Sequence, residues 1–177
     1  KSIPVESAKE ATLRVVRTYS DLEAKPVVIE EAFYKDGSLL RFTIEQKQLV
    51  QKGELRLENG KAHFEYWTDG QSKKASEDLG ENFIVVDGIF PFIKQNFSQI
   101  KTGETIKFRL AVLDRLESVG FKVFLDKKFT LDGKPVSIVK MKPSSFIIAA
   151  IVDPILFFVS EENGISLVQV VGRTAPK

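Results

Sequence analysis

Hydrophobic and polar residues alternate along most of this chain with a period of two. The alternation is clearest in the segments 40–45, 54–58, 106–112 and 118–125. In 106–112, every second residue is apolar: Ile106, Phe108, Leu110 and Val112. A period of two is typical of strands that bury one face and leave the other in solvent. The pattern therefore predicts an antiparallel sheet.

Two-residue turn signals separate the alternating runs. They are Asp36-Gly37, Asn59-Gly60, Asp132-Gly133 and Asn163-Gly164. Because Asn, Asp and Gly tolerate the positive φ angles of tight turns, each signal predicts a hairpin. The strands are expected at 12–19, 26–35, 39–47, 49–58, 61–68, 82–86, 104–114, 117–131, 134–142, 154–161 and 164–172.

One segment, 87–103, breaks the period of two. Its apolar residues follow the spacing of a helix: Ile89, Phe92, Ile93, Phe97 and Ile100. Asp87 is suited to cap the start, and Gly103 is suited to end the helix. The pattern predicts an amphipathic helix over about 88–100.

These elements predict a mainly β fold: a highly curved antiparallel sheet, a half-barrel or open barrel of about 10–11 strands, with the helix plugging or flanking it. Short helices are expected over 5–10 and over 144–151, where Ser144 or Ser145 can cap the turn. The polar segment 71–82 is expected to be a mobile loop. A chain of 177 residues with 43% apolar content fits a single domain, 1–177.

The most apolar stretch is "SSFIIAAIVDPILFFVS" (144–160). A membrane-spanning helix needs about 20 predominantly apolar residues. Here Asp153-Pro154 interrupts the run after Phe146 to Val152, so the sequence predicts no transmembrane segment. The stretch is expected to form core or the wall of an apolar pocket.

Composition excludes several classes of function. The net charge of +2 comes from 26 basic and 24 acidic side chains, too even a balance for a nucleic-acid footprint over the whole surface. Without cysteine, the chain has no disulfide, thiol nucleophile or Cys-ligated metal. No glycine pattern suits a phosphate-binding loop, so we expect no cofactor. Because the chain begins with Lys1 rather than Met, we expect that a signal peptide has been removed.

Candidate catalytic groups are few. His63, the only histidine, shares a strand face with Glu65, and such a pair can perform acid–base chemistry. No second histidine or nucleophile motif accompanies it, so a solvated strand face is the favoured interpretation. The adjacent acids Glu30-Glu31 and Glu161-Glu162 point to opposite strand faces. We therefore predict a protein that is not an enzyme and has no catalytic residue or metal site.

Lysines gather in the segment 122–142. They are Lys122, Lys127, Lys128, Lys134, Lys140 and Lys142. Such a group can contact anionic lipid head groups or a phosphate backbone. Charge on exposed strands also prevents edge-to-edge pairing, and this is the favoured interpretation.

Three stretches carry a resemblance that covers most of the chain. They are "YKDGSLLRF" (34–42), "NFIVVDGIFPFIKQNFSQIKTGETIKFRLAVLDRLESVGFKV" (82–123), and "DGKPVSIVKMKPSSFIIAAIVDPILFFVS" (132–160) followed by "VVGRT" (170–174). Together they resemble an uncharacterised family of exported or envelope-associated bacterial proteins with a domain of unknown function. That family is similar to the periplasmic lipoprotein carriers, half-barrels whose helix-plugged concavity holds acyl chains. The resemblance implies a periplasmic or outer-envelope location and a lipid-like ligand, and transfers no site residue.

Phenylalanines are concentrated in one part of the chain: eleven of the fourteen lie between Phe83 and Phe158. We therefore expect a non-enzymatic envelope protein that binds a lipid or acyl chain in the concave face of its sheet. The expected wall consists of Phe90, Phe97, Phe146, Ile147, Ile151, Phe157 and Phe158. The alternative is a structural or interaction protein with a filled core and an envelope protein partner. Neither hypothesis involves nucleic acid.

Overall fold

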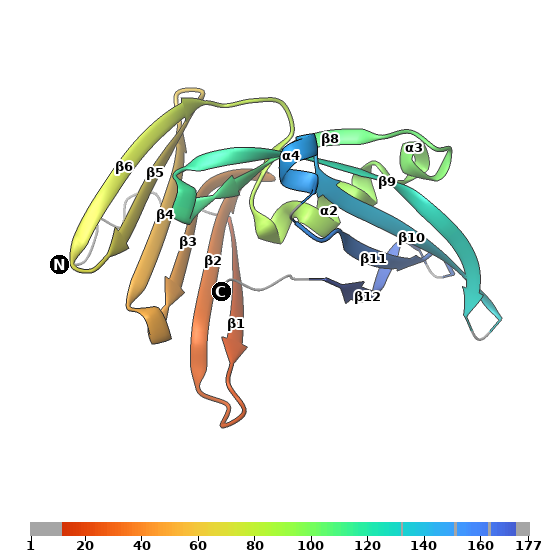
Figure 1. The fold of residues 1–177 in the computed structure, drawn as a ribbon, viewed down its shortest axis with the longest axis horizontal. Coiled ribbons are helices and arrows are strands. Elements are labelled where there is room, and N and C mark those ends of the chain that lie inside the picture. Colours follow the sequence, from red (N-terminus) through yellow and green to blue (C-terminus); the bar gives the residue numbers. More distant parts are fainter. Residues whose placement is uncertain (1–11, 132, 151, 163, 173–177) are drawn as a thin grey trace. The chain divides into compact units, whose positions relative to one another are not determined.

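The computed structural model describes residues 12–131, 133–150, 152–162 and 164–172 (Figure 1). The predicted fold class is confirmed: the chain is mainly β, with few helices, and one sheet is curled strongly into a half-barrel. The twelve strands of the described residues form two six-stranded sheets. We name the sheet of β1–β6 sheet A and the sheet of β7–β12 sheet B.

Each sheet belongs to one of two compact units. Unit 1 contains the described residues up to Gly80 together with Val112–Glu117. Unit 2 contains Glu81–Ala111 and the described residues from Ser118 onward. The single domain expected from the chain length stays a prediction.

Sheet A is a meander in which each strand pairs antiparallel with the next. Its strands are β1 (Leu13–Ser20), β2 (Pro26–Lys35), β3 (Ser38–Gln46), β4 (Gln51–Glu58), β5 (Lys61–Thr68) and β6 (Gln71–Asp78). Positive φ angles at Asp36-Gly37 and Asn59-Gly60 close the β2–β3 and β4–β5 hairpins. Both hairpins are therefore confirmed at the residues that predict them.

The mobile loop predicted over 71–82 is wrong, because most of this segment is β6. Asp69-Gly70 has the same positive φ angles as the other turns and joins β5 to β6. The backbone of β6 pairs with β5 along its length, from Gln71 to Asp78. Most of its side chains are exposed on both faces, so the segment shows none of the alternation that marks a half-buried strand.

The core of unit 1 lies on one face of sheet A. Four apolar residues stand opposite one another across β2–β5: Ala32, Phe42, Leu55 and Phe64. Leu55 is fully buried, and Phe64 is only 2% exposed. The strand neighbours of Phe42, Leu55 and Phe64 are polar, whereas Ala32 precedes the buried Phe33, so the alternation separates a core face from a mostly polar face.

A glycine of β4 makes room for the short 3-10 helix η3 (Leu113–Arg115), which belongs to unit 1. The side chain of Leu113 is buried against Gly53. A Cβ atom on Gly53 would lie 2.7 Å from Leu113 Cδ2 and 2.9 Å from Ile44 Cγ2. These distances are too short for van der Waals contact, so only glycine fits beneath this leucine.

We expect Gly53→Ala to destabilise the protein by about 1–3 kcal/mol, because the added methyl group overpacks the contact with Leu113. The free energy of unfolding in urea measures the loss. Gly120→Ala is the matched control, since Gly120 also lies within a strand but its added Cβ would meet Ser144 at an ordinary 3.6 Å. Equal losses in the two variants would contradict the steric explanation.

Tyr66 lies on the core face of β5, and its hydroxyl donates a 2.9 Å hydrogen bond to Gln51 Oε1. Burial raises the pKa of the Tyr66 phenol above its ordinary value of 10.0, and the charge of Asp114 raises this pKa further. A raised folded-state pKa means that folding favours the protonated phenol. The corresponding stability is present below about pH 10 and is lost as the pH rises through the folded pKa.

We therefore expect Tyr66→Phe to cost about 1 kcal/mol of stability at pH 8, where the hydrogen bond is intact. The deficit should shrink at pH 11, because the wild-type phenol loses stability on ionising and phenylalanine does not titrate. Urea unfolding at the two pH values measures both differences. A deficit that grows with pH would show that the sign of the pKa shift is wrong.

Sheet B is antiparallel except for the parallel pair β7–β8. Its strands are β7 (Phe83–Ile84), β8 (Ile106–Val112), β9 (Glu117–Leu131), β10 (Lys134–Pro143), β11 (Ile155–Ser160) and β12 (Ser166–Val171). The β9–β10 and β11–β12 pairs confirm the last two predicted hairpins. Asp132 and Asn163, the first residues of those turn signals, lie outside the described residues.

The helix predicted over about 88–100 is interrupted. It consists of α2 (Ile89–Gln95) and α3 (Phe97–Lys101), and the short 3-10 helix η2 (Val86–Gly88) precedes them. The side-chain amide of Asn96, between α2 and α3, donates a 2.8 Å hydrogen bond to the Phe92 carbonyl. Gly88 rather than Asp87 occupies the N-cap position of α2. Gly103 adopts a φ of 99° just after α3, where the sequence predicts the end.

All five apolar residues that predict this helix are buried. They form one hydrophobic cluster with residues of sheet B: Phe108, Val123, Val139, Met141, Phe157 and Val159. The rings of Phe92 and Phe108 lie 5.2 Å apart, centroid to centroid. The two helices therefore flank the apolar face of sheet B and complete the core of unit 2.

The helix predicted over 144–151 is present in shorter form as α4 (Phe146–Ala149), with Ser145 at the N-cap position. The Ser145 carbonyl, not its side chain, accepts the first helical hydrogen bond, from the Ala149 amide. The helix predicted over 5–10 lies outside the described residues. Within the part of the chain that the structure describes, no helix combines the length and apolarity needed to cross a membrane.

Candidate functional site

The structure distributes the predicted ligand wall over different environments. Phe97 and Phe157 are 2% and 5% exposed in the core of unit 2, and Phe90 packs against that core. Phe158 is partly buried, with an edge-to-face contact to Phe129. Ile151 lies outside the described residues.

Phe146 and Ile147 are the exception, because they are strongly exposed. Their exposed fractions are 87% and 78%, the second and fourth highest among the large hydrophobic residues exposed in the described chain. Both residues belong to α4, which packs on β10. Both side chains are therefore exposed to solvent on the same short helix, while the role of all seven wall residues stays a prediction.

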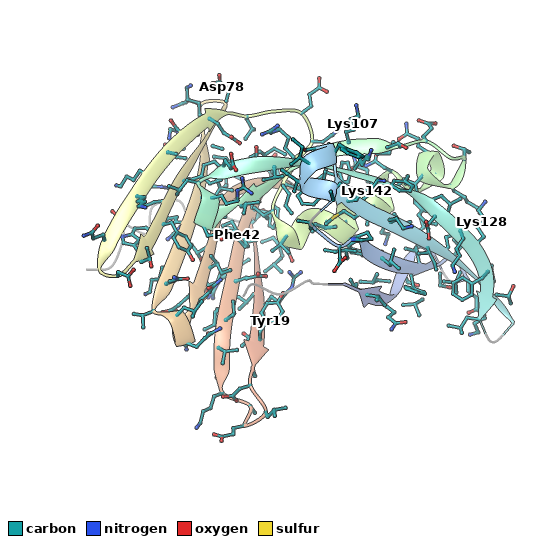
Figure 2. The ribbon with its side chains drawn as sticks, in the orientation of Figure 1. Tyr19, Phe42, Asp78, Lys107, Lys128 and Lys142 are labelled. Atoms are coloured by element: carbon teal, nitrogen blue, oxygen red, sulfur yellow. The ribbon has the colours of Figure 1, made fainter. Side chains whose placement is uncertain are left out.

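Basic side chains lie on the strands next to α4. Lys142 lies near the end of β10 (Figure 2). In the register of the two strands it stands directly opposite Lys122 of β9. The Lys142 ammonium lies 5.4 Å from the centroid of the Phe124 ring. Lys140 pairs with Asp126. Two like charges opposite each other destabilise a sheet, and a bound anion relieves the repulsion.

A second candidate site is a hollow of about 460 Å³ on the polar face of sheet A. Its lining comes from β4, β5 and β6: Glu54, Arg56, Glu58, His63, Phe64, Glu65, Lys74, Ala75 and Ser76. All of these residues belong to unit 1. We name it the sheet A hollow.

Register arranges the polar side chains of this face in three rows across β4, β5 and β6. The first row is Glu54, Glu65 and Lys74. The middle row, which we name the donor row, is Arg56, His63 and Ser76. The last row is Glu58, Lys61 and Asp78. A row of N–H and O–H donors therefore lies between two rows that contain carboxylates.

The carboxylate of Glu54 is the buried anchor of the sheet A hollow, with only 3% of its side chain exposed. One oxygen lies 3.1 Å from Arg41 Nε, and the other accepts a 3.1 Å hydrogen bond from Arg41 Nη2. Arg56 Nε lies 3.3 Å from the same carboxylate. Two guanidinium groups thus hold Glu54 in place and compensate its charge.

Two further ion pairs occupy the flanking rows. Glu65 pairs with Lys74 at 3.1 Å, and Lys61 pairs with Asp78 at 2.8 Å. The hydrogen bond from Lys61, together with its positive charge, holds the pKa of Asp78 below its usual value. Because Asp78 is at the exposed end of β6 (Figure 2), water screens this pair strongly.

His63 and Glu65 both line the sheet A hollow, as the sequence suggests they could. Among the described residues, however, no hydrogen bond joins them: Glu65 pairs with Lys74, and the His63 ring has no partner. The described residues contain no group of three His, Asp or Glu side chains placed to hold a metal ion. The expectation that the protein is not an enzyme stays a prediction.

Sequence reasoning missed Arg41, Glu54 and Ser76 as members of a site. Arg41 and Glu54 lie on different strands and meet only through the register of sheet A. Ser76 falls in the segment expected to be a loop. The turn signal Asp69-Gly70 was available to place β6 beside β5, and with it Ser76 beside His63.

A scan against protein-family models and searches of curated proteins and of solved structures found no match to this chain. The resemblance to exported bacterial proteins and to lipoprotein carriers stays a prediction. What the candidate sites can bind therefore follows from their own side chains, burial and charge.

We expect Arg41→Met to cost about 3 kcal/mol of stability, because it removes one partner of a buried ion pair. Arg56 remains beside Glu54 and keeps the loss at the lower end of the usual range. Urea unfolding measures the loss. Lys25→Ala is the control, since the Lys25–Glu23 pair is more than 70% exposed at both ends and should cost less than about 1 kcal/mol. Similar losses would show that burial of Glu54 has no energetic consequence.

Proposed function

We propose that this protein binds a lipid-like ligand without catalysing a reaction, and that α4 makes the apolar contact. The observation that carries the proposal is the exposure of Phe146 and Ile147, which stand side by side on one helical turn. Single exposed apolar residues are common on protein surfaces. Here Val152 adds a third exposed apolar side chain within the same connection between β10 and β11.

Covering the exposed side chains of Phe146 and Ile147 would release a substantial free energy. Transfer of a Phe or Ile side chain from water to an apolar environment is worth about 1.5–3 kcal/mol. The α4 turn presents two such side chains. Because both are mostly exposed, little of this free energy is gained when the protein folds. An acyl chain laid against α4 would recover that free energy.

Charge favours an anionic lipid as the occupant. Lys122 and Lys142 lie opposite each other on β9 and β10, and β10 leads directly into α4. Neither forms an ion pair among the described residues, and Lys142 only approaches the Phe124 ring. An anionic head group over these ammonium groups and an acyl chain over α4 would satisfy both kinds of surface.

This proposal differs from the expected wall in where the ligand lies. Phe97 and Phe157 pack into the core of unit 2, so the acyl chain is assigned to α4 and not to the space between the helices and sheet B. A periplasmic or outer-envelope location remains part of the proposal. It is supported by the resemblance of the three quoted stretches alone.

The second candidate is a structural or interaction protein with an envelope partner. Its supporting observation is the packing of unit 2, where Ile93, Ile100 and Val139 are fully buried in one hydrophobic cluster. Such a filled core needs no ligand for stability. This candidate predicts that gently extracted protein carries no lipid and is recovered with a protein partner.

Vesicle co-sedimentation tests the lipid proposal. We expect binding to vesicles of phosphatidylglycerol and phosphatidylcholine, and weaker binding to phosphatidylcholine alone. The double variant Phe146→Ser/Ile147→Ser should lower affinity about 100-fold, which corresponds to roughly 3 kcal/mol for two side chains. Unchanged binding by this variant would overturn the role of α4.

The matched control is Leu49→Ser/Val50→Ser. Leu49 and Val50 are also adjacent and exposed, at 45% and 84%. Leu49 is the last residue of the short 3-10 helix η1 (Lys47–Leu49), and Val50 follows it. We expect vesicle binding to survive this change. Loss of binding in the control would show that exposed apolar residues in general, and not α4, hold the protein to lipid.

A further inference from the structure

We propose that the sheet A hollow binds a neutral, hydroxyl-rich ligand, a saccharide. The proposal uses residues of unit 1 only and is independent of α4 and of lipid binding. It depends on three features of the hollow: its balance of charge, its arrangement of donors and acceptors, and the rigidity of its buried anchor.

The charges of the sheet A hollow cancel. Three basic side chains line the hollow or lie beside it: Arg41, Arg56 and Lys74. Three acidic side chains line it: Glu54, Glu58 and Glu65. The Lys61–Asp78 pair at its border is neutral as well. A strongly charged ligand would meet repulsion from half of these groups, so the balance favours an uncharged ligand.

Hydrogen-bonding groups in the hollow suit hydroxyls. His63 and Ser76 have no side-chain partner among the described residues, and Arg56 uses its Nε toward Glu54. These donors lie between carboxylates, of which Glu58 has no partner among the described residues. A hydroxyl group both donates and accepts. A ligand with several hydroxyls can therefore accept from the donor row and donate to the flanking carboxylates at once.

The buried anchor makes the hollow preorganised. Glu54 is held by Arg41 of β3 and by Arg56 of its own strand, whose Nε atoms both lie close to Glu54 Oε1. Side chains that are already ordered lose little conformational entropy when a ligand binds. Arg56 is therefore held in place before the ligand arrives.

An aromatic ring extends the same face. Trp67 follows Glu65 by two residues on β5, so its indole projects from the polar face one row beyond the hollow, between Lys52 and Ser72. Flat aromatic rings offer apolar surface to the C–H faces of sugar rings. Trp67 is also the only tryptophan of the chain, so its fluorescence reports on this face alone.

The test is titration of the full chain with neutral hexasaccharides of glucose and of N-acetylglucosamine, followed by Trp67 fluorescence and by calorimetry. We expect saturable binding of at least one saccharide by calorimetry, with or without a change in fluorescence. Citrate, inorganic phosphate and spermidine are the charged probes. Binding of a charged probe alone, or no binding of any saccharide, would overturn the proposal.

Variants locate the site. His63→Ala and Ser76→Ala break no described ion pair, and each should weaken saccharide binding about 3- to 10-fold by removing one hydrogen bond. Lys73→Ala is the matched control, because Lys73 lies on β6 but projects from the opposite face. Equal weakening by Lys73→Ala, or no effect of His63→Ala and Ser76→Ala, would sink the assignment. Phe146→Ser/Ile147→Ser should leave saccharide binding unchanged.

Discussion

The register of sheet A is the constraint on which unit 1 depends. Two-residue turns with positive φ angles at Asp36, Asn59 and Asp69 close the β2–β3, β4–β5 and β5–β6 hairpins and restrict sliding of these strand pairs. Since successive strand residues point to opposite faces, a shift of one residue would exchange Leu55 and Glu54. Such a shift would put the carboxylate in the core and the leucine in water. The turns therefore determine both the core and the polar face.

Burial of Glu54 is a strong electrostatic demand that this register creates. A carboxylate that is 97% removed from water must find compensating charge, and Arg41 and Arg56 supply it from the neighbouring strand and from its own. The same contacts hold Arg56, the first member of the donor row, beside Glu54. The polar face of sheet A therefore combines one buried, charge-compensated carboxylate with more exposed ion pairs such as Lys74–Glu65 and Lys61–Asp78.

Unit 2 meets the opposite demand, the burial of aromatic and branched side chains. The helices α2 and α3 cover the apolar face of sheet B, and the rings of Phe92, Phe108 and Phe121 pack in sequence. This packing buries or partly buries most of the phenylalanines on which the prediction of a lipid ligand is based. Phe146 is the one phenylalanine of the described residues that stays largely exposed, so the proposed lipid contact narrows from a whole sheet face to Phe146 and Ile147.

The sequence by itself determined the elements whose signals are local. Alternation and Asn-Gly or Asp-Gly turns located the strands, and the spacing of Ile89, Phe92 and Ile93 identified a helix and its buried face, because backbone geometry imposes those periods on neighbouring residues. Strand β6 was not predicted, because it has no buried face that would give an alternating pattern. It pairs with β5 through its backbone along its length. Only the tertiary structure decided that the strands divide into two sheets and that Phe97 is buried in the core while Phe146 is exposed. It also decided that Arg56, His63 and Ser76 share one row. Contacts between strands depend on the register of pairing and on how much surface the neighbouring elements cover. The sequence of one strand alone specifies neither of these.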